Sequence, residues 1–258
     1  MLSLEQYGDV TRLRFSTPIT RALGYEVSAY LTRGVLVDTG FPDVAREFAA
    51  WLDRGRPKGI VLTHHHEDHA GNLDLAARGG LPIAAADITL QAVRDEGRLD
   101  WYRRVCWGQP PLFRSAVTSF EPPGMRLIHL PGHSHDHHAV WDAERETLFA
   151  GDLFIGVKVR IAKDDEVIHE QVKSLRQAIT FRPRRMFCAH RGLVPDPVGA
   201  LKAKADWLEG ITGEARRMAG MGVSEGEITR RLLGREGLVR LTSRGRLCKR
   251  NLIRAVNC

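Results

Sequence analysis

The stretch VLTHHHEDHAGN concentrates groups that bind metal ions, with four histidines and two acids in six consecutive positions. Alternate side chains of an extended backbone share one face, so His64 and His66 are expected to converge on one ion. Asp68 and His69 follow past a bend and are expected to reach another ion. Imidazole and carboxylate groups together favour zinc or a neighbouring first-row metal, and the absence of cysteine argues against a purely structural zinc site.

Three further residues of ligand type each follow a segment that is predicted to be a strand. His133 lies in LPGHSHDHH, Asp152 in LFAGDLF and His190 in FCAHRG. Because rigid strands deliver the residues at their ends to one rim, these side chains are expected to join the histidine cluster. Seven ligands are too many for one tetrahedral ion, but they suit two ions that share a carboxylate and a water. The sequence therefore predicts a two-ion site that activates water.

The elements that must position these residues alternate between short strands and helices through most of the chain. The expected strands are 11–16, 25–32, 34–40, 58–64, 81–86, 125–132, 138–144, 147–152 and 184–190. The expected helices are 42–54, 71–80, 87–97 and 166–180, the third of them opening on Asp87 as a cap. The aromatic and basic segment 101–115 fits neither period. It is interpreted either as an irregular cover of the site or as tryptophans that pack on the core.

The chain from about residue 197 onward reads as helical only. The expected helices there are 200–219, 224–234 and 245–256, and the second opens with a Ser-x-x-Glu capping box. This change of pattern predicts a boundary between a first domain, 1–196, and a C-terminal helical region, 197–258.

Composition bounds the class of protein further. The chain has 258 residues, 43% of them hydrophobic, and a formal net charge of +7 whose excess lies late in the sequence. No apolar run is long enough for a membrane helix and the start lacks a signal-peptide layout, so a cytoplasmic protein without membrane contact is expected. The four scattered cysteines are expected to be reduced. The basic tail fits nucleic acid, an acidic substrate or a solvated face.

Five motifs together point to a family. In this order, DTG, THHHEDHAGN, PGHSHDHH, AGD and AHRG resemble the motifs of the metallo-β-lactamase superfamily, over roughly Asp38 to His190. The resemblance implies an α/β fold, the αββα sandwich, with metals at one edge of its two sheets and a C-terminal helical extension. Carried over position by position, it implies His64, His66 and His133 as ligands of the first ion, Asp68, His69 and His190 as ligands of the second, and Asp152 between them. Two divalent ions are implied, with Zn²⁺ the expected metal and Fe or Mn as alternatives.

The activity that the resemblance implies is that of a metallo-hydrolase. A hydroxide bridging the two metals would cleave a thioester or ester of a small, anionic substrate, and Asp68 would be catalytic by binding metal and orienting that hydroxide. PGHSHDHH and the C-terminal helices resemble the branch that includes glyoxalase II and small lactamase-like hydrolases, although no counterpart of the glutathione-binding segment is found. Two alternatives stay open, a single-strand endoribonuclease of the same fold and a low-turnover metal-binding regulatory protein. A small molecule is favoured over nucleic acid as the partner, and the sequence does not indicate an oligomeric state.

Other polar side chains are expected near this site. His137 is interpreted as a residue that supports a ligand or the fold. Lys158, Arg160 and Arg191 are candidates for holding an anionic group of the substrate, with solvated surface charge as the alternative. Three more residues of ligand type are expected to point elsewhere or to be inert: His65, Glu67 and Cys188.

Overall fold

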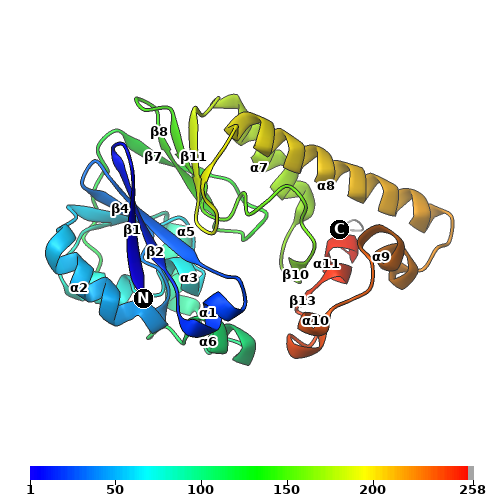
Figure 1. Ribbon diagram of the computed structural model, residues 1–258, viewed down its shortest axis with the longest axis horizontal. Coiled ribbons are helices and arrows are strands. Elements are labelled where there is room, and N and C mark those ends of the chain that lie inside the picture. The colour runs from blue at the N-terminus through cyan, green and yellow to red at the C-terminus, as the bar shows by residue number, and fades with distance from the viewer. Residues whose placement is uncertain (255–258) are drawn as a thin grey trace.

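Two sheets lie face to face in the computed structural model, which describes residues 1–254, and helices cover their outer faces (Figure 1). The first sheet has the strand order β1 (Leu2–Tyr7), β2 (Val10–Phe15), β3 (Val27–Thr32), β4 (Val35–Val37), β5 (Gly59–Val61) and β6 (Ile83–Ala84). The second has the order β12 (Gly192–Val194), β11 (Arg185–Cys188), β9 (Thr147–Phe149), β8 (His138–Asp142) and β7 (Met125–His129). The αββα sandwich expected from the sequence is confirmed.

The helices fall into two outer layers and a set of connections. Helices α2 (Ala45–Gly55) and α4 (Leu73–Arg78) pack on the first sheet, and α7 (Ile168–Thr180) and α8 (Pro197–Gly220) on the second. The shorter connecting helices are α1 (Pro18–Ala22), the 3₁₀ turn η1 (Pro42–Val44), α3 (Glu67–Ala70), α5 (Asp87–Asp95) and α6 (Trp101–Trp107).

The interior between the sheets is apolar and aromatic. Along β3, Val27 and Ala29 lie in the core beneath α2, and Tyr30 faces the second sheet, as the two-residue period of a strand requires. The ring of Tyr30 packs on those of Phe149 and Phe187, with centroids 5.6 and 5.1 Å apart. These contacts hold one sheet against the other, and they therefore fix where the ends of their strands meet.

The C-terminal part of the chain corrects the expectation that it would be helical only. Strand β13 (Leu247–Cys248) pairs antiparallel with β10 (Ala162–Lys163), a strand from the first 196 residues. Neither strand was predicted, because two residues leave no alternation to detect. The helices of this part after α8 are α9 (Glu225–Leu233), α10 (Leu238–Thr242) and α11 (Lys249–Arg254). Residues 255 and 256 of the last expected helix lie outside the described residues.

Other local expectations also need correction. The segment expected to be irregular, 101–115, begins with helix α6. Asp87 is the first residue of α5, and Ala86 occupies the cap position without a side-chain hydrogen bond. Ser224, by contrast, does cap α9, since its hydroxyl accepts from the N–H of Glu227 at 3.4 Å. The strands β1 and β12 and the helices α1 and α10 were not predicted.

The structure bears on two expectations that came from composition, namely reduced cysteines and the lack of a membrane helix. Cys106, Cys188 and Cys248 are buried free thiols, and Cys258 lies outside the described residues. Among residues 1–254, no helix combines the length and the apolar character that crossing a membrane requires.

Asn251 ties the C-terminal part of the chain to β10, so its replacement should be costly. Its side-chain amide donates to the carbonyls of Ala162, Gly245 and Arg246 at 3.0–3.1 Å, and the residue is buried. We expect Asn251→Ala to lower the free energy of unfolding by about 2 kcal/mol, because the buried carbonyl of Ala162 loses this donor and two partly buried hydrogen bonds are also lost. Urea unfolding measures the change. The exposed Arg235→Ala is the control, and an Asn251→Ala variant as stable as this control would contradict the assignment.

Candidate metal centre

Three imidazoles converge at the edge of the sandwich. The chain leaves β5 at Val61 and reaches His64 and His66, while His133 comes from the loop between β7 and β8. Nδ1 of His66 lies 2.9 Å from Nε2 of His64 and 3.1 Å from Nε2 of His133, and all three residues are buried. Three ring nitrogens that face one another at such distances suit a shared cation.

Helix α3 turns the chain so that the next two ligand-type residues reach a second position. His66 is at the N-terminal cap of this helix, and Asp68 and His69 lie within it. Together with Asp152 and His190 they form a second group whose ligand atoms all lie within 4.8 Å of one another. The bend expected between the two halves of the motif is therefore a helical turn.

Asp152 lies between the two groups. Its Oδ2 is 3.4 Å from Nε2 of His133, and its Oδ1 is 3.3 Å from Nε2 of His69 and 3.1 Å from Nε2 of His190. This carboxylate is almost fully buried and faces imidazoles of both groups. The structure thus brings together all seven predicted residues, from the ends of strands in both sheets.

Unsatisfied polar atoms test whether these residues fit metal ions. Within residues 1–254, Nε2 of His69 and Oδ1 of Asp152 are buried and make no hydrogen bond. Buried polar atoms without partners are rare because their desolvation is not compensated. Both atoms are of a type that binds zinc and its neighbours, and both point into the same small space. The two groups fit a divalent metal site.

Hydrogen bonds on the far side of the rings fix their orientation. Nδ1 of His69 donates to Oδ2 of Asp38 at 2.8 Å, and Nδ1 of His190 donates to the carbonyl of Glu26 at 2.8 Å. Nδ1 of His64 lies 3.1 Å from the hydroxyl of Thr63, which in turn donates to Asp38. Such partners leave Nε2 free to face a metal and raise its basicity. The DTG motif was recognised from the sequence, but the role of its aspartate was not.

His137 supports Asp152 and does not face the cluster. Its Nδ1 donates to the carbonyl of Leu130 at 3.0 Å, and its Nε2 accepts from the backbone N–H of Asp152 at 3.1 Å. Burial lowers the pKa of His137 to about 4, so the ring is neutral at physiological pH. The interpretation of His137 as a supporting residue agrees with this geometry.

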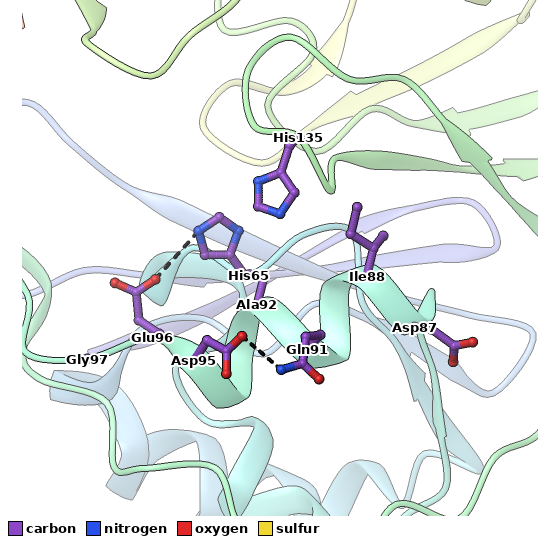
Figure 2. Close-up of a pocket in the computed structure, with 9 residues that line it drawn as sticks. All are labelled: His65, Asp87, Ile88, Gln91, Ala92, Asp95, Glu96, Gly97 and His135. Carbon is purple, nitrogen blue, oxygen red and sulfur yellow. Dashed lines mark hydrogen bonds and ion pairs between the residues drawn. The ribbon is translucent and has the colours of Figure 1, made fainter.

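The side chains between the ligand-type residues point elsewhere, as expected. Nδ1 of His65 lies 2.7 Å from Oδ1 of Asp136, and Glu67 accepts from Nε of Arg103 at 2.9 Å. His65 also borders a hollow of about 620 Å³ against α5, where it lies 3.5 Å from Glu96 (Figure 2). This hollow lies beside the metal-type cluster and is lined by none of its seven members.

The charges of the two groups differ. Burial and the neighbouring histidines hold the pKa of His64 well below its usual range. Burial also opposes the charge of His190, but the carboxylates of Asp152 and Asp68 outweigh it and raise the pKa of His190 to about 9. Burial likewise disfavours the charge of Asp152, yet His190 and His69 hold its pKa well below the usual range. The second group therefore holds negative charge that a proton or a metal must balance.

The three cations expected to hold substrate are Lys158, Arg160 and Arg191. Within residues 1–254, none of them makes a contact with this cluster. Lys158 and Arg160 are exposed, and Nε of Arg191 donates to the carbonyl of Ile155 at 3.1 Å. The cation that does reach the cluster is Lys163, which the sequence analysis did not identify. Its Nζ lies 2.8 Å from Nε2 of His66. No sequence signal marked Lys163, because the short strand β10 that carries it has no detectable period.

An aromatic wall borders the second group. The ring of Trp107, in α6, lies 6.4 Å from that of His190 and 5.0 Å from that of Phe41. The half-exposed ring of Tyr25 lies 6.1 Å from that of Trp107. Trp107 thus both packs on the core and stands next to the site, although the part of segment 101–115 that carries it is helical and not irregular.

Comparison with known proteins decides the family. The sequence model of the metallo-beta-lactamase superfamily matches residues 25–190, which include all seven clustered residues. The chain belongs to the metallo-beta-lactamase superfamily. The structure of a metallo-beta-lactamase family protein from Thermus thermophilus superposes with a TM-score of 0.65, at 17% identity, over 97% of this chain and 91% of that one. It shares the fold.

Two relatives are similar in sequence to this chain over more than two thirds of its length. "Beta-lactamase-like protein 2 homolog" of Drosophila melanogaster is 30% identical over 216 residues, 75% of this chain and 70% of that protein. "Atrochrysone carboxyl ACP thioesterase" of Aspergillus fumigatus is 30% identical over 187 residues, 71% of this chain but 39% of that protein. The chain thus spans well under half of the thioesterase that it matches.

The raised pKa of His190 predicts how the stability of metal-free protein depends on pH. Its pKa is about 9 in the folded chain and 6.5 in its ordinary state, so the folded state binds the extra proton more tightly. The resulting stabilisation is fully present below pH 6.5 and is lost as the pH rises through about 9. Urea unfolding in the presence of a chelator, at intervals from about pH 6 to about pH 9.5, measures the loss. His190→Gln should flatten this decline, and an equal decline in both proteins would contradict the assignment.

Proposed function

We propose that this chain is a hydrolase of thioesters or esters with a small, anionic substrate, and that it works with two divalent ions, Zn²⁺ in the first instance. The position of Asp152 carries the proposal, because its two oxygens face the imidazoles of both groups at 3.1–3.4 Å. A carboxylate in such a position suits two ions that share one ligand. His64, His66 and His133 would hold one ion, and Asp68, His69 and His190 the other. When bound, such ions supply an activated water and polarise the carbonyl that is attacked.

Asp68 is the proposed catalytic residue. Its Oδ2 lies 3.5 Å from Nε2 of His190 and 3.8 Å from Nε2 of His69, at the border of the second group. The carboxylate sits at the start of helix α3, next to the turn that His66 caps. From there Asp68 would hold the second ion through Oδ2, orient the attacking water and accept its proton at the other carboxylate oxygen. No serine or cysteine nucleophile is required. Burial raises the pKa of Cys188, the thiol nearest to His190 in sequence, to about 11, which makes it a poor nucleophile.

The surroundings of the site favour an acyl substrate. Next to the second group, the partly exposed Trp107 and the half-exposed Tyr25 offer apolar surface, and the buried Phe41 packs against Trp107. An acyl chain can be buried there without losing hydrogen bonds to water. The name of the Aspergillus fumigatus relative, a thioesterase, supports the same bond type. Nucleic acid remains the alternative partner because the tail is basic.

A substrate panel tests this proposal. Zinc-loaded protein should release thiol from small acyl thioesters that carry a carboxylate, with thiol release followed by a colorimetric reagent. Asp68→Asn should lower kcat by roughly 10²–10⁴-fold while the fold is retained, because the attacking water loses its base. His169→Asn is the control, since His169 is exposed on α7 away from the cluster. Full activity in a folded Asp68→Asn protein would contradict the role of this residue.

Salt dependence separates the thioesterase from the nuclease. A small acidic substrate neutralises one or two charges, so its turnover should fall only mildly as salt rises. Binding of RNA along the basic tail would fall by about 0.7 in log affinity per phosphate contact for each tenfold rise in salt. Neutralising the exposed Arg240 and Arg244 together as glutamine should leave thioester cleavage intact. RNA cleavage that is salt-sensitive and lost in this double variant, without thioester turnover, would reverse the assignment.

A further inference from the structure

Lys163 reaches the candidate metal centre from β10. Its Nζ lies 2.8 Å from Nε2 of His66 and 3.3 Å from Oδ2 of Asp165. The side chain of Lys163 is 19% exposed, whereas that of Asp165 is 60% exposed and thus largely hydrated. The imidazole is therefore the main fixed partner of this ammonium.

In each of the five imidazoles of the two groups, one ring nitrogen faces away from the cluster, and we call it the outer nitrogen. The outer nitrogen of His66 has a different kind of partner from the outer nitrogens of the other four rings. In His64, His69 and His190 the outer nitrogen lies within 3.1 Å of an oxygen that can accept its proton. In His133 it lies 3.8 Å from Oε1 of Glu166. Lysine has donors and no acceptor, so His66 must accept at Nε2 and carry its own proton at Nδ1. That nitrogen is the one facing the other two rings.

A cation at Nδ1 of His66 is incompatible with this arrangement. Coordination uses the lone pair of Nδ1, so the single proton of the neutral ring moves to Nε2. Two donors would then face each other at the distance of a hydrogen bond, so the ammonium of Lys163 would be left with the largely hydrated carboxylate of Asp165. Its backbone stays in place, because the N–H of Lys163 donates to Oε1 of Glu166 at 3.3 Å and β10 is paired with β13.

We propose that Lys163 binds the carboxylate of the substrate, and that occupation of the first metal position frees its ammonium to do so. A single ammonium matches the single charge of a carboxylate. The ammonium lies 2.8 Å from His66, a proposed ligand of the first ion, so one small molecule can place its carboxylate there and its carbonyl at the ions. This inference rests on the proposed hydrolysis and deepens it by naming the residue that selects an acidic substrate. It also gives the C-terminal segment a part in the site, since β13 holds the strand that carries Lys163.

Anion binding tests the proposal without turnover. Calorimetric titration of zinc-loaded protein with succinate and with acetate compares a dicarboxylate with a monocarboxylate. Both probes can contact a metal, but succinate alone has a second carboxylate for Lys163. Wild-type protein should prefer succinate, and Lys163→Met should weaken succinate binding roughly ten- to a hundredfold while leaving acetate binding unchanged. Lys163→Arg should retain most of the preference.

Two further variants make the result specific. Lys173→Met, an exposed position on α7, should behave as wild type. Lys158→Met tests the cation first expected from the sequence to hold the anion. The same preference in Lys163→Met and wild type, no preference in wild type, or a loss confined to Lys158→Met would each overturn the proposal.

Metal affinity tests the second half of the inference. If the ammonium competes with a cation for His66, metal-free Lys163→Met should bind the first Zn²⁺ more tightly than wild type, in competition with a chromophoric chelator. Lys173→Met should not. Equal or weaker zinc binding by Lys163→Met would contradict the release of Lys163. These readouts differ from the test of hydrolysis, since protein that binds succinate through Lys163 but cleaves no thioester would refute the proposed reaction alone.

Discussion

The carboxylate of Asp152 is the constraint on which the rest of this site depends. A charged group that is almost fully buried must be balanced by opposite charge or by donors, and Asp152 has imidazoles of His69, His133 and His190 around it. These rings come from different strand ends of both sheets. The contact between the sheets, made by rings such as that of Tyr30, therefore decides whether the cluster can assemble.

The surrounding chain orients this cluster from outside. Asp38 accepts a hydrogen bond from the ring of His69, and His137 accepts one from the backbone N–H of Asp152. The C-terminal segment adds a further layer, because β13 fixes β10 and so places Lys163 against His66. Every other ring of the two groups has an oxygen near its outer nitrogen. The one ring with an ammonium there marks the side on which a negatively charged substrate group would be expected.

The family resemblance predicted the sandwich, and the spacing of ligand-type residues predicted the seven clustered residues, but the sequence indicated little of what orients them. Spacing within HHHEDH and the positions of His133, Asp152 and His190 after strands are local signals, and they were sufficient. Lys163 lies on a two-residue strand whose partner, β13, is far away in sequence. Its position depends on tertiary pairing, which no local period reports. Lys158 and Arg160 carried the same charge signal yet are exposed, since charge alone does not indicate direction.

Metal stoichiometry tests the central claim, that Asp152 joins two metal positions, most directly. Metal-free protein is titrated with Zn²⁺, and the zinc retained after gel filtration is counted by elemental analysis. We expect about two equivalents for wild type. We expect about one for His69→Ala, which keeps the three imidazoles of His64, His66 and His133. A wild-type protein that retains one equivalent or none, or a His69→Ala protein that still retains two, would contradict the account.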